Sequence, residues 1–174
     1  MRAGSSAEAQ ERAAWTLGNL AIQADNQVAI VSAGAIGPLV ALTRGGSAWA
    51  QEVAAWTLGH LAMHADHREA IAQAGAIEPL VALVRSGSAE TQVMAAVTLG
   101  NLANNAEMKV VIIHAGVIEP LEALARDGGA EAQKTAAWAL TTLVAYPRWY
   151  GNRVWQWYDN GMAMVWRTGR QEYT

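Results

Sequence analysis

The stretch Ala13–Ala21, AAWTLGNLA, indicates the fold because this motif is repeated along the sequence. Close copies begin at Ala54 (AAWTLGHLA) and Ala95 (AAVTLGNLA), and a weaker copy, AAWALTTLV, begins at Ala136. Each copy starts 41 residues after the one before it. A constant period of about 20 to 50 residues is typical of stacked repeats, in which no unit can bury its apolar face alone. The sequence therefore predicts a repeat protein whose function depends on the array.

One period, residues 65–105, predicts three helices. Asp66 is expected to cap a short first helix that ends at Gly75, since glycine readily takes the left-handed conformation that stops a helix. Pro79 fits only the first turn of a second helix, over 79–86, because it has no amide hydrogen to donate. Ser88 is expected to cap a third helix that runs to about 103. The corresponding residues are Gly34 and Gly116, Pro38 and Pro120, and Ser6 and Ser47.

The composition bounds the functional class. The chain has 174 residues, of which 52% are apolar, and this length and composition suit one domain. Its net charge of −3 gives no sign of a basic surface that would bind nucleic acid or acidic lipid. It has no cysteine, which removes disulfides, thiol catalysis and zinc–thiolate sites. No signal peptide or apolar run of about 18 residues is visible. We expect an intracellular protein, cytoplasmic or nuclear, without a membrane or nucleic-acid partner.

These motifs resemble the armadillo (ARM) repeat family, whose AGAIxPLVxL phrase is followed by AAWxLxNLA. The resemblance covers roughly residues 6–146, and two-helix HEAT repeats rank second because they lack the short first helix ending in Ala-Gly. It implies an all-α fold, a right-handed α-solenoid of three-helix repeats. The expected units are a partial repeat with only a third helix (1–23), three armadillo repeats (24–64, 65–105 and 106–146) and a tail rich in Trp, Tyr and Arg (147–174).

In armadillo proteins the third helices line the concave wall of a superhelix. The resemblance implies that the Trp of each phrase packs along an extended peptide, and that the Asn one turn later pairs with the peptide backbone. An amide side chain suits this role because it both donates and accepts. Apolar residues follow on the same helices. The candidate groove residues are Trp15, Asn19, Ile22, Trp56, His60, Met63, Val97, Asn101, Trp138 and Thr142.

This ladder is incomplete in three places. Val97 stands where the other units carry Trp, so one aromatic side chain is missing from the groove. Thr142 is too short to bridge two backbone groups, and His60 replaces an asparagine. Trp138, near the end of the array, could instead serve only packing between repeats. Basic nuclear-import peptides need acids in the groove, and the positions three residues before the Trp sites carry none, so basic cargo is not expected. Those positions are Arg12, Val53, Met94 and Thr135.

After Tyr146 the period fails and the composition changes. The segment RVWQWYDNGMAMVWR alternates on both sides of Asn160-Gly161, which predicts a β-hairpin. Three interpretations stay open: a cap on the last repeat, docking on another copy, or disorder or recognition of a sugar or single-stranded nucleic acid. The residues expected to make tail or oligomer contacts are Trp149, Trp155, Trp157 and Trp166.

Two further features bear on partners. A lone third helix at 6–23 exposes an apolar face, so we expect either a homo-oligomer, a dimer, or a longer array of which this chain is a part. Trp49 stands where the other repeats carry Glu8, Glu90 and Glu131, and an exposed Trp there indicates a contact.

The search for reactive chemistry finds little. His60, His64 and His67 have a metal-ligand spacing, but their register partners are mostly polar variable residues, so no metal site is expected. No phosphate loop, nucleophile elbow or carboxylate pair appears, and no cofactor or enzymatic activity is expected. The favoured function is a non-catalytic scaffold that binds an extended peptide or partner helix in the groove. The alternative is a self-assembling homo-oligomeric module, designed or a fragment, whose tail docks on another copy.

Overall fold

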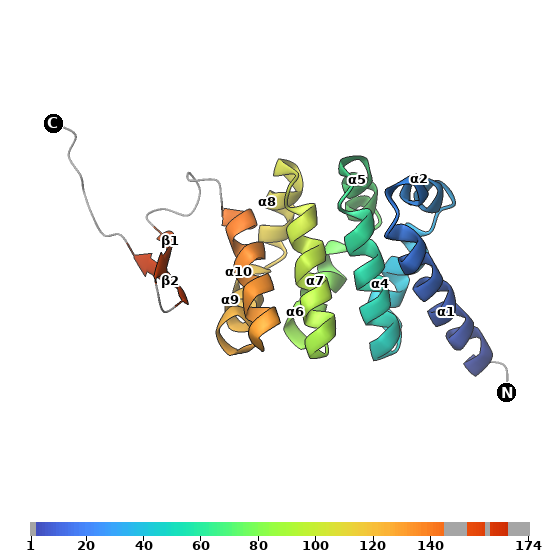
Figure 1. Cartoon of the computed structure of the whole chain (residues 1–174), viewed down its shortest axis with the longest axis horizontal. Helices are drawn as coiled ribbons and strands as arrows, with labels where there is room; N and C mark the ends of the chain where they lie inside the picture. The colour runs from blue at the N-terminus through green and yellow to red at the C-terminus, as the bar shows by residue number, and fades with distance from the viewer. Residues whose placement is uncertain (1–2, 145–152, 159–160, 167–174) are drawn as a thin grey trace.

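The structure, a computed structural model, describes the backbone of residues 3–144, 153–158 and 161–166 and the side chains of residues 7–144. Figure 1 shows the helices of this part stacked in one row, with α1 and α10 at opposite ends. The expected all-helical solenoid of three-helix units is confirmed over residues 3–144. The helices are α1 (Ala3–Ala21), α2 (Ala24–Ser32), α3 (Ile36–Gly45), α4 (Ala48–Leu61), α5 (Ala65–Gln73), α6 (Ile77–Ser86), α7 (Ala89–Leu102), α8 (Ala106–His114), α9 (Ile118–Asp127) and α10 (Ala130–Val144).

A sharp corner separates the first helix of each unit from the second. The glycine at the corner has a positive φ in all three units, +78° at Gly34, +76° at Gly75 and +78° at Gly116. Residues with a Cβ rarely adopt this left-handed conformation, which explains the repeated glycine. Pro79 follows in the first turn of α6, where a backbone N–H would have no partner within the helix. The predicted corner is therefore confirmed.

Serine side chains start two of the third helices. Ser47 Oγ accepts a hydrogen bond from the N–H of Ala50 at 3.2 Å, and Ser88 Oγ accepts one from the N–H of Thr91 at 3.2 Å. Each bond satisfies one of the N–H groups that the first helical turn leaves without an intrahelical partner. These two predicted caps are confirmed.

Two other predicted caps are wrong. The helix α1 already begins at Ala3, so Ser6 lies within the helix instead of before it. The helix α5 begins at Ala65, with His64 at its N-cap position. Asp66 lies in the first turn, where a carboxylate still interacts favourably with the helix dipole.

The core lies between the third helices and the second helices along the whole row. The helix α4 packs against α3, α7 against α6 and α10 against α9, while α1, α4, α7 and α10 lie side by side (Figure 1). On α4, Leu58 and Leu61 are fully buried in this core. We call the solvent-facing side of α1, α4, α7 and α10 the third-helix face.

Buried threonines connect neighbouring third helices. Thr98 Oγ1 lies 2.9 Å from the carbonyl oxygen of Ala55 in the preceding unit and 2.8 Å from that of Met94 in its own helix. Thr57 Oγ1 lies 3.4 Å from the carbonyl oxygen of Ala14. Both threonines are fully buried. The threonine of the repeated phrase therefore contributes to the stacking of the units.

Two strands follow the helical array in the sequence. Strand β1 (Arg153–Tyr158) pairs in antiparallel register with β2 (Gly161–Trp166), with Trp155 opposite Met164. The pair lies where the sequence predicts a hairpin. Trp149 lies outside the described residues, as do the side chains of Trp155, Trp157 and Trp166, on which the expected tail contacts depend.

Within the described part of the chain, no single helix has the length and apolar composition needed to cross a bilayer. One pair, α2 with α3, meets the test only when taken together, and it is bent by 86°.

Candidate functional site

The indoles of the repeated phrase pack against glycines of the preceding unit. A Cβ placed on Gly18 would lie 2.3 Å from Cζ3 of Trp56, and a Cβ on Gly100 would lie 2.2 Å from Cζ3 of Trp138. Glycine is therefore the residue that lets each indole lie directly on the neighbouring helix. Trp138 does pack between repeats, as the alternative interpretation expected, yet 42% of it stays exposed on the third-helix face.

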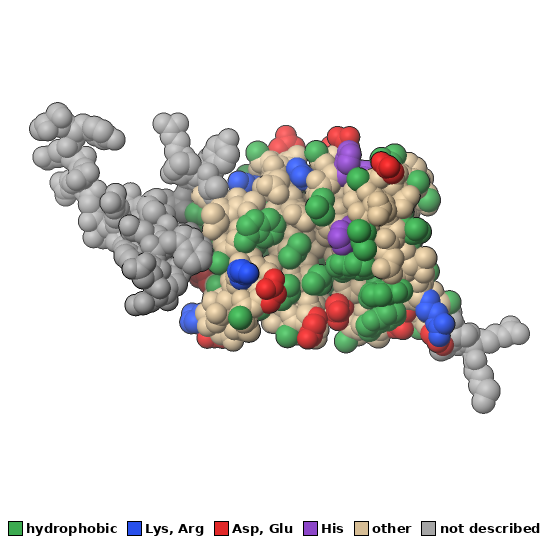
Figure 2. Space-filling model, in the orientation of Figure 1, with side chains coloured by type: hydrophobic (Ala, Val, Ile, Leu, Met, Phe, Trp, Pro, Cys, Tyr) green, Lys and Arg blue, Asp and Glu red, His purple; other side chains and the backbone are tan. Residues whose placement is uncertain are grey.

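Three indoles and an imidazole form a continuous surface on α1 and α4. The ring centroids of Trp15 and Trp49 lie 6.1 Å apart, those of Trp15 and Trp56 lie 5.6 Å apart, and those of Trp56 and His60 lie 5.0 Å apart. Trp15 is 48% exposed and Trp49 is 42% exposed. We call these four residues the aromatic strip. Figure 2 shows hydrophobic side chains gathered at the α1 and α4 end of this face, with histidine beside them.

The aromatic strip contains one residue that the predicted ladder did not include. Trp49 precedes Trp56 by two helical turns, so the two lie on the same side of α4. The sequence did single out Trp49, because the equivalent positions of the other units carry glutamate. The ladder residues Ile22 and Met63 are also exposed, near the ends of the same two helices.

The polar side chains of the ladder are already hydrogen bonded to helix carbonyls through their donors. Asn19 Nδ2 donates to the carbonyl of Trp15 at 3.0 Å, and Asn101 Nδ2 donates to the carbonyl of Gly59 at 3.1 Å. Thr142 Oγ1 likewise donates to its own helix, at 3.0 Å. Neither asparagine Oδ1 accepts a hydrogen bond within the described residues. These amides can therefore accept from a ligand N–H without breaking the array.

Acidic side chains do lie on the third-helix face. Glu11 and Glu52 stand one turn before Trp15 and Trp56, a spacing that places them on the same helix side. From the sequence we do not expect basic cargo, because the positions three residues before each Trp, expected to line the groove, carry no acid. That premise fails at two of the four positions, because Val53 and Thr135 are buried, with exposed fractions of 3% and 8%. Figure 2 shows acidic side chains along the edge of the face at which the third helices begin.

The acids differ in whether they have a partner. Glu8 forms an ion pair with Arg12 at 2.6 Å, and the carboxylate of Glu11 accepts a hydrogen bond from the hydroxyl of Ser47. Glu52 is half-buried and has no ion pair or hydrogen-bond partner within residues 7–144. A carboxylate in this state can bind a cationic group of a ligand.

His60 is the titratable member of the aromatic strip. Its imidazole meets the Trp56 ring edge to face, and burial lowers the pKa of His60 below its ordinary value because it disfavours the charged form. His60 is therefore mostly neutral at pH 7 and can either donate or accept one hydrogen bond.

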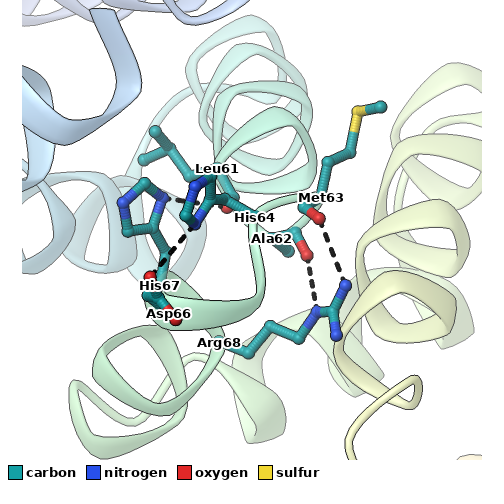
Figure 3. A network of polar contacts seen from close by, with 7 residues as sticks. All are labelled: Leu61, Ala62, Met63, His64, Asp66, His67 and Arg68. Atoms are coloured by element: carbon teal, nitrogen blue, oxygen red, sulfur yellow. Dashed lines mark hydrogen bonds and ion pairs between the residues drawn. The ribbon is translucent and has the colours of Figure 1, made fainter. Parts of the chain in front are cut away.

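Two further histidines, His64 and His67, lie at the corner between α4 and α5 (Figure 3). His67 Nδ1 lies 3.3 Å from the carbonyl oxygen of Leu61, while Arg68 donates to the carbonyl of Ala62 at 2.9 Å and to that of Met63 at 3.1 Å. These carbonyls belong to Leu61, the last residue of α4, and to the two residues that follow it, where the helix no longer supplies N–H partners. The side chains at this corner therefore stabilise a helix end.

The same arrangement recurs one unit earlier, where Asn26 and Gln27 donate to the carbonyls of Leu20 and Ala21 at 3.1 and 2.9 Å. The polar residues in register with His67 and Arg68 thus share one structural role. His64 stacks on His67 with centroids 4.6 Å apart. No group of three His, Cys, Asp or Glu in the described chain is arranged to hold a metal ion.

Comparisons with known proteins identify relatives of the array. The model of the Armadillo/beta-catenin-like repeat matches residues 23–63, 64–104 and 105–145. No curated protein matches significantly. Among solved structures, an engineered protein has a TM-score of 0.76 and 36% identity over 81% of this chain and 58% of its own.

Two designed proteins are also similar. A designed armadillo repeat protein in complex with the peptide (KR)4 has a TM-score of 0.71 and 31% identity over 76% of this chain and 57% of its own. Computationally designed armadillo repeat proteins for modular peptide recognition give a TM-score of 0.73 and 29% identity over 76% of this chain and 57% of theirs. The present chain thus spans less than two thirds of these structures.

Proposed function

Because the chain belongs to the armadillo repeat family, we propose that its third-helix face is a non-catalytic surface that binds an extended peptide or a partner helix. One observation carries the proposal: each unit brings an equivalent residue to the same face, and three of these four residues are tryptophans, Trp15, Trp56 and Trp138. Two similar solved structures support it: a designed armadillo repeat protein in complex with a peptide, and computationally designed armadillo repeat proteins for modular peptide recognition.

The proposed mode of binding follows from the side chains. The third-helix face would form the concave wall of a right-handed superhelix, and the peptide would cross α1, α4, α7 and α10 in turn. The Oδ1 atoms of Asn19 and Asn101 would accept hydrogen bonds from peptide N–H groups, which does not depend on the peptide sequence. The indoles would supply apolar contacts between these points.

The test is peptide capture by variants of the intact chain. A library of displayed peptides is selected against the protein, and the captured peptides are measured against Asn19→Ala and Asn101→Ala. We expect both variants to lose affinity by about three- to tenfold per hydrogen bond, while helicity is preserved. Gln73→Ala is the matched control, since Gln73 donates only to Glu69 on α5. Capture that is equal in all four proteins would place the site elsewhere.

A second candidate function is self-assembly, and one observation favours it. A cavity of about 400 Å³ opens between α1 and α3, with Ala14, Leu39 and Leu42 among its lining residues. A dimer in which a second copy covers this apolar opening, or in which the tail 147–174 docks on another copy, would exclude water from it.

Light scattering of two variants distinguishes the two forms of self-assembly, because each variant removes one of the two contacts. Deletion of 147–174 would leave a dimer intact if the cavity is the contact, and Leu42→Glu would dissociate it. A monomeric mass for the intact chain at high concentration would exclude this function.

For the peptide-binding function we propose a cytoplasmic or nuclear location, which the absence of cysteine supports.

A further inference from the structure

We propose that the aromatic strip binds a proline-rich segment in the polyproline II conformation, with a basic residue beside the prolines. This inference rests on the proposed function and specifies which peptide the α1 and α4 half of the third-helix face takes. The contributing residues are Trp49, Trp15, Trp56, His60 and Glu52.

The spacing of the rings suits this conformation. Polyproline II rises by about 3.1 Å per residue, so two residues advance by about 6.2 Å. The successive centroids from Trp49 to Trp15 and from Trp15 to Trp56 are separated by 6.1 and 5.6 Å. Aromatic-lined surfaces bind such segments because the extended helix is already formed and loses little entropy on binding.

The indole N–H groups are available as donors. Within residues 7–144 no hydrogen bond is donated by the N–H of Trp15, Trp49 or Trp56. The Trp56 Nε1 is not a buried unpaired atom either, so it reaches solvent. Polyproline II has no internal hydrogen bonds, and all its carbonyl groups are free to accept. The aromatic strip therefore offers donors to a ligand that is rich in acceptors.

The strip also lacks the asparagine amide that can donate to and accept from a peptide backbone at the same time. The ladder places asparagine at positions 19 and 101, but α4 carries His60 at the equivalent position. Proline has no N–H, so a proline-rich segment loses no hydrogen bond where the amide is absent. Of the two units that lack the asparagine, the one with His60 also gains the extra indole of Trp49.

The charge beside the strip indicates a basic neighbour for the prolines. Glu52 lies three residues after Trp49 and four before Trp56, so its carboxylate lies on the same side of α4 as both rings. It is the acid at the strip that has no partner in the described structure, since Glu8 and Glu11 are engaged by Arg12 and Ser47. An arginine both pairs with a carboxylate and stacks on an indole.

The experiment measures fluorescence anisotropy of a labelled peptide of one arginine followed by nine prolines, titrated with the intact protein. Trp49→Glu restores the residue that α1, α7 and α10 carry at this position, so folding should be kept, and thermal melting checks it. We expect this variant to weaken binding at least about tenfold, or 1.4 kcal/mol. Val110→Glu is the control because Val110 is exposed, at 53%, on α8 outside the third-helix face, and α5 carries Glu69 at the equivalent position; it should change the affinity less than about twofold.

A second variant separates the charge from the rings. Glu52→Gln should weaken binding of the arginine-containing peptide and leave binding of ten prolines unchanged. Equal losses in Trp49→Glu and Val110→Glu would overturn the inference, as would equal effects of Glu52→Gln on both peptides. If the proline peptides fail to bind while library peptides are captured through Asn101, the inference is wrong and the proposed function stands. If neither class binds, both are wrong.

Discussion

The packing of an indole on a glycine gives a sharp test of how the units stack. Gly100→Ala places a Cβ 2.2 Å from Cζ3 and 2.6 Å from Cη2 of Trp138. Carbon atoms pack best at about 3.5–4.0 Å, so the ring must move by more than about 1 Å. Overpacking of this kind costs about 1–3 kcal/mol, while replacing a helical glycine by alanine recovers up to about 1 kcal/mol. We expect a net loss of about 1–2 kcal/mol, or about 3–6 °C in Tm.

The assay is a double-mutant cycle in chemical denaturation, with Gly37→Ala as the matched control. A Cβ on Gly37 would meet nothing within 4 Å, and the register positions carry Glu78 and Glu119, so this change should stabilise by about 0.5 kcal/mol. With Trp138→Val already present, Gly100→Ala should also become neutral or stabilising, because the obstructing ring is gone. A cost for Gly100→Ala that is the same in both backgrounds would refute this account of the stacking.

Three further predictions concern single groups. Ser88→Ala removes the cap that accepts from the N–H of Thr91 and should lower the free energy of unfolding by about 1 kcal/mol, whereas Ser86→Ala, at an exposed helix end, should be nearly neutral. Thr98→Val keeps the shape and removes a buried hydroxyl that bonds to the preceding unit; urea denaturation should show a loss of about 1 kcal/mol, and no loss would exclude a role in stacking. Burial lowers the pKa of His60, so the unfolded chain binds more protons and stability should fall as the pH drops below about 6.5; the decrease should be smaller in His60→Asn, and an unchanged pH profile would contradict it.

The fold was predictable because its signals recur in register. A single Gly or Pro would have been weak evidence, but Gly75 and Pro79 recur with the same spacing in three units, and each position confirms the others. The cap at Asp66 was not predictable in the same way. Several residues near a helix start can satisfy its N–H groups, and the choice among them depends on the path of the preceding turn.

The candidate site was predictable only in part. Sequence spacing places Glu52 and Val53 next to each other, yet one lies at the surface and the other is buried, and only the packing of α4 against its neighbours decides which. The contact between Trp49 and Trp15 joins neighbouring units through residues that are far apart in the sequence, so no local pattern indicates it. What the register did show is that Trp49 replaces an acid.

The same indoles are used both to stack the units and to form the proposed binding surface. Trp56 presses one part of its ring on Gly18 and contacts Trp15 and His60 with the rest. Rings that are held by the neighbouring unit lose little freedom when a ligand binds, which favours affinity. It also follows that removing Trp56 would weaken the stacking and the surface together. Trp49 differs from the other members of the aromatic strip because it lies in the first turn of α4 and has an acidic equivalent in the other units. Substitution of Trp49 can therefore change binding and leave the array intact.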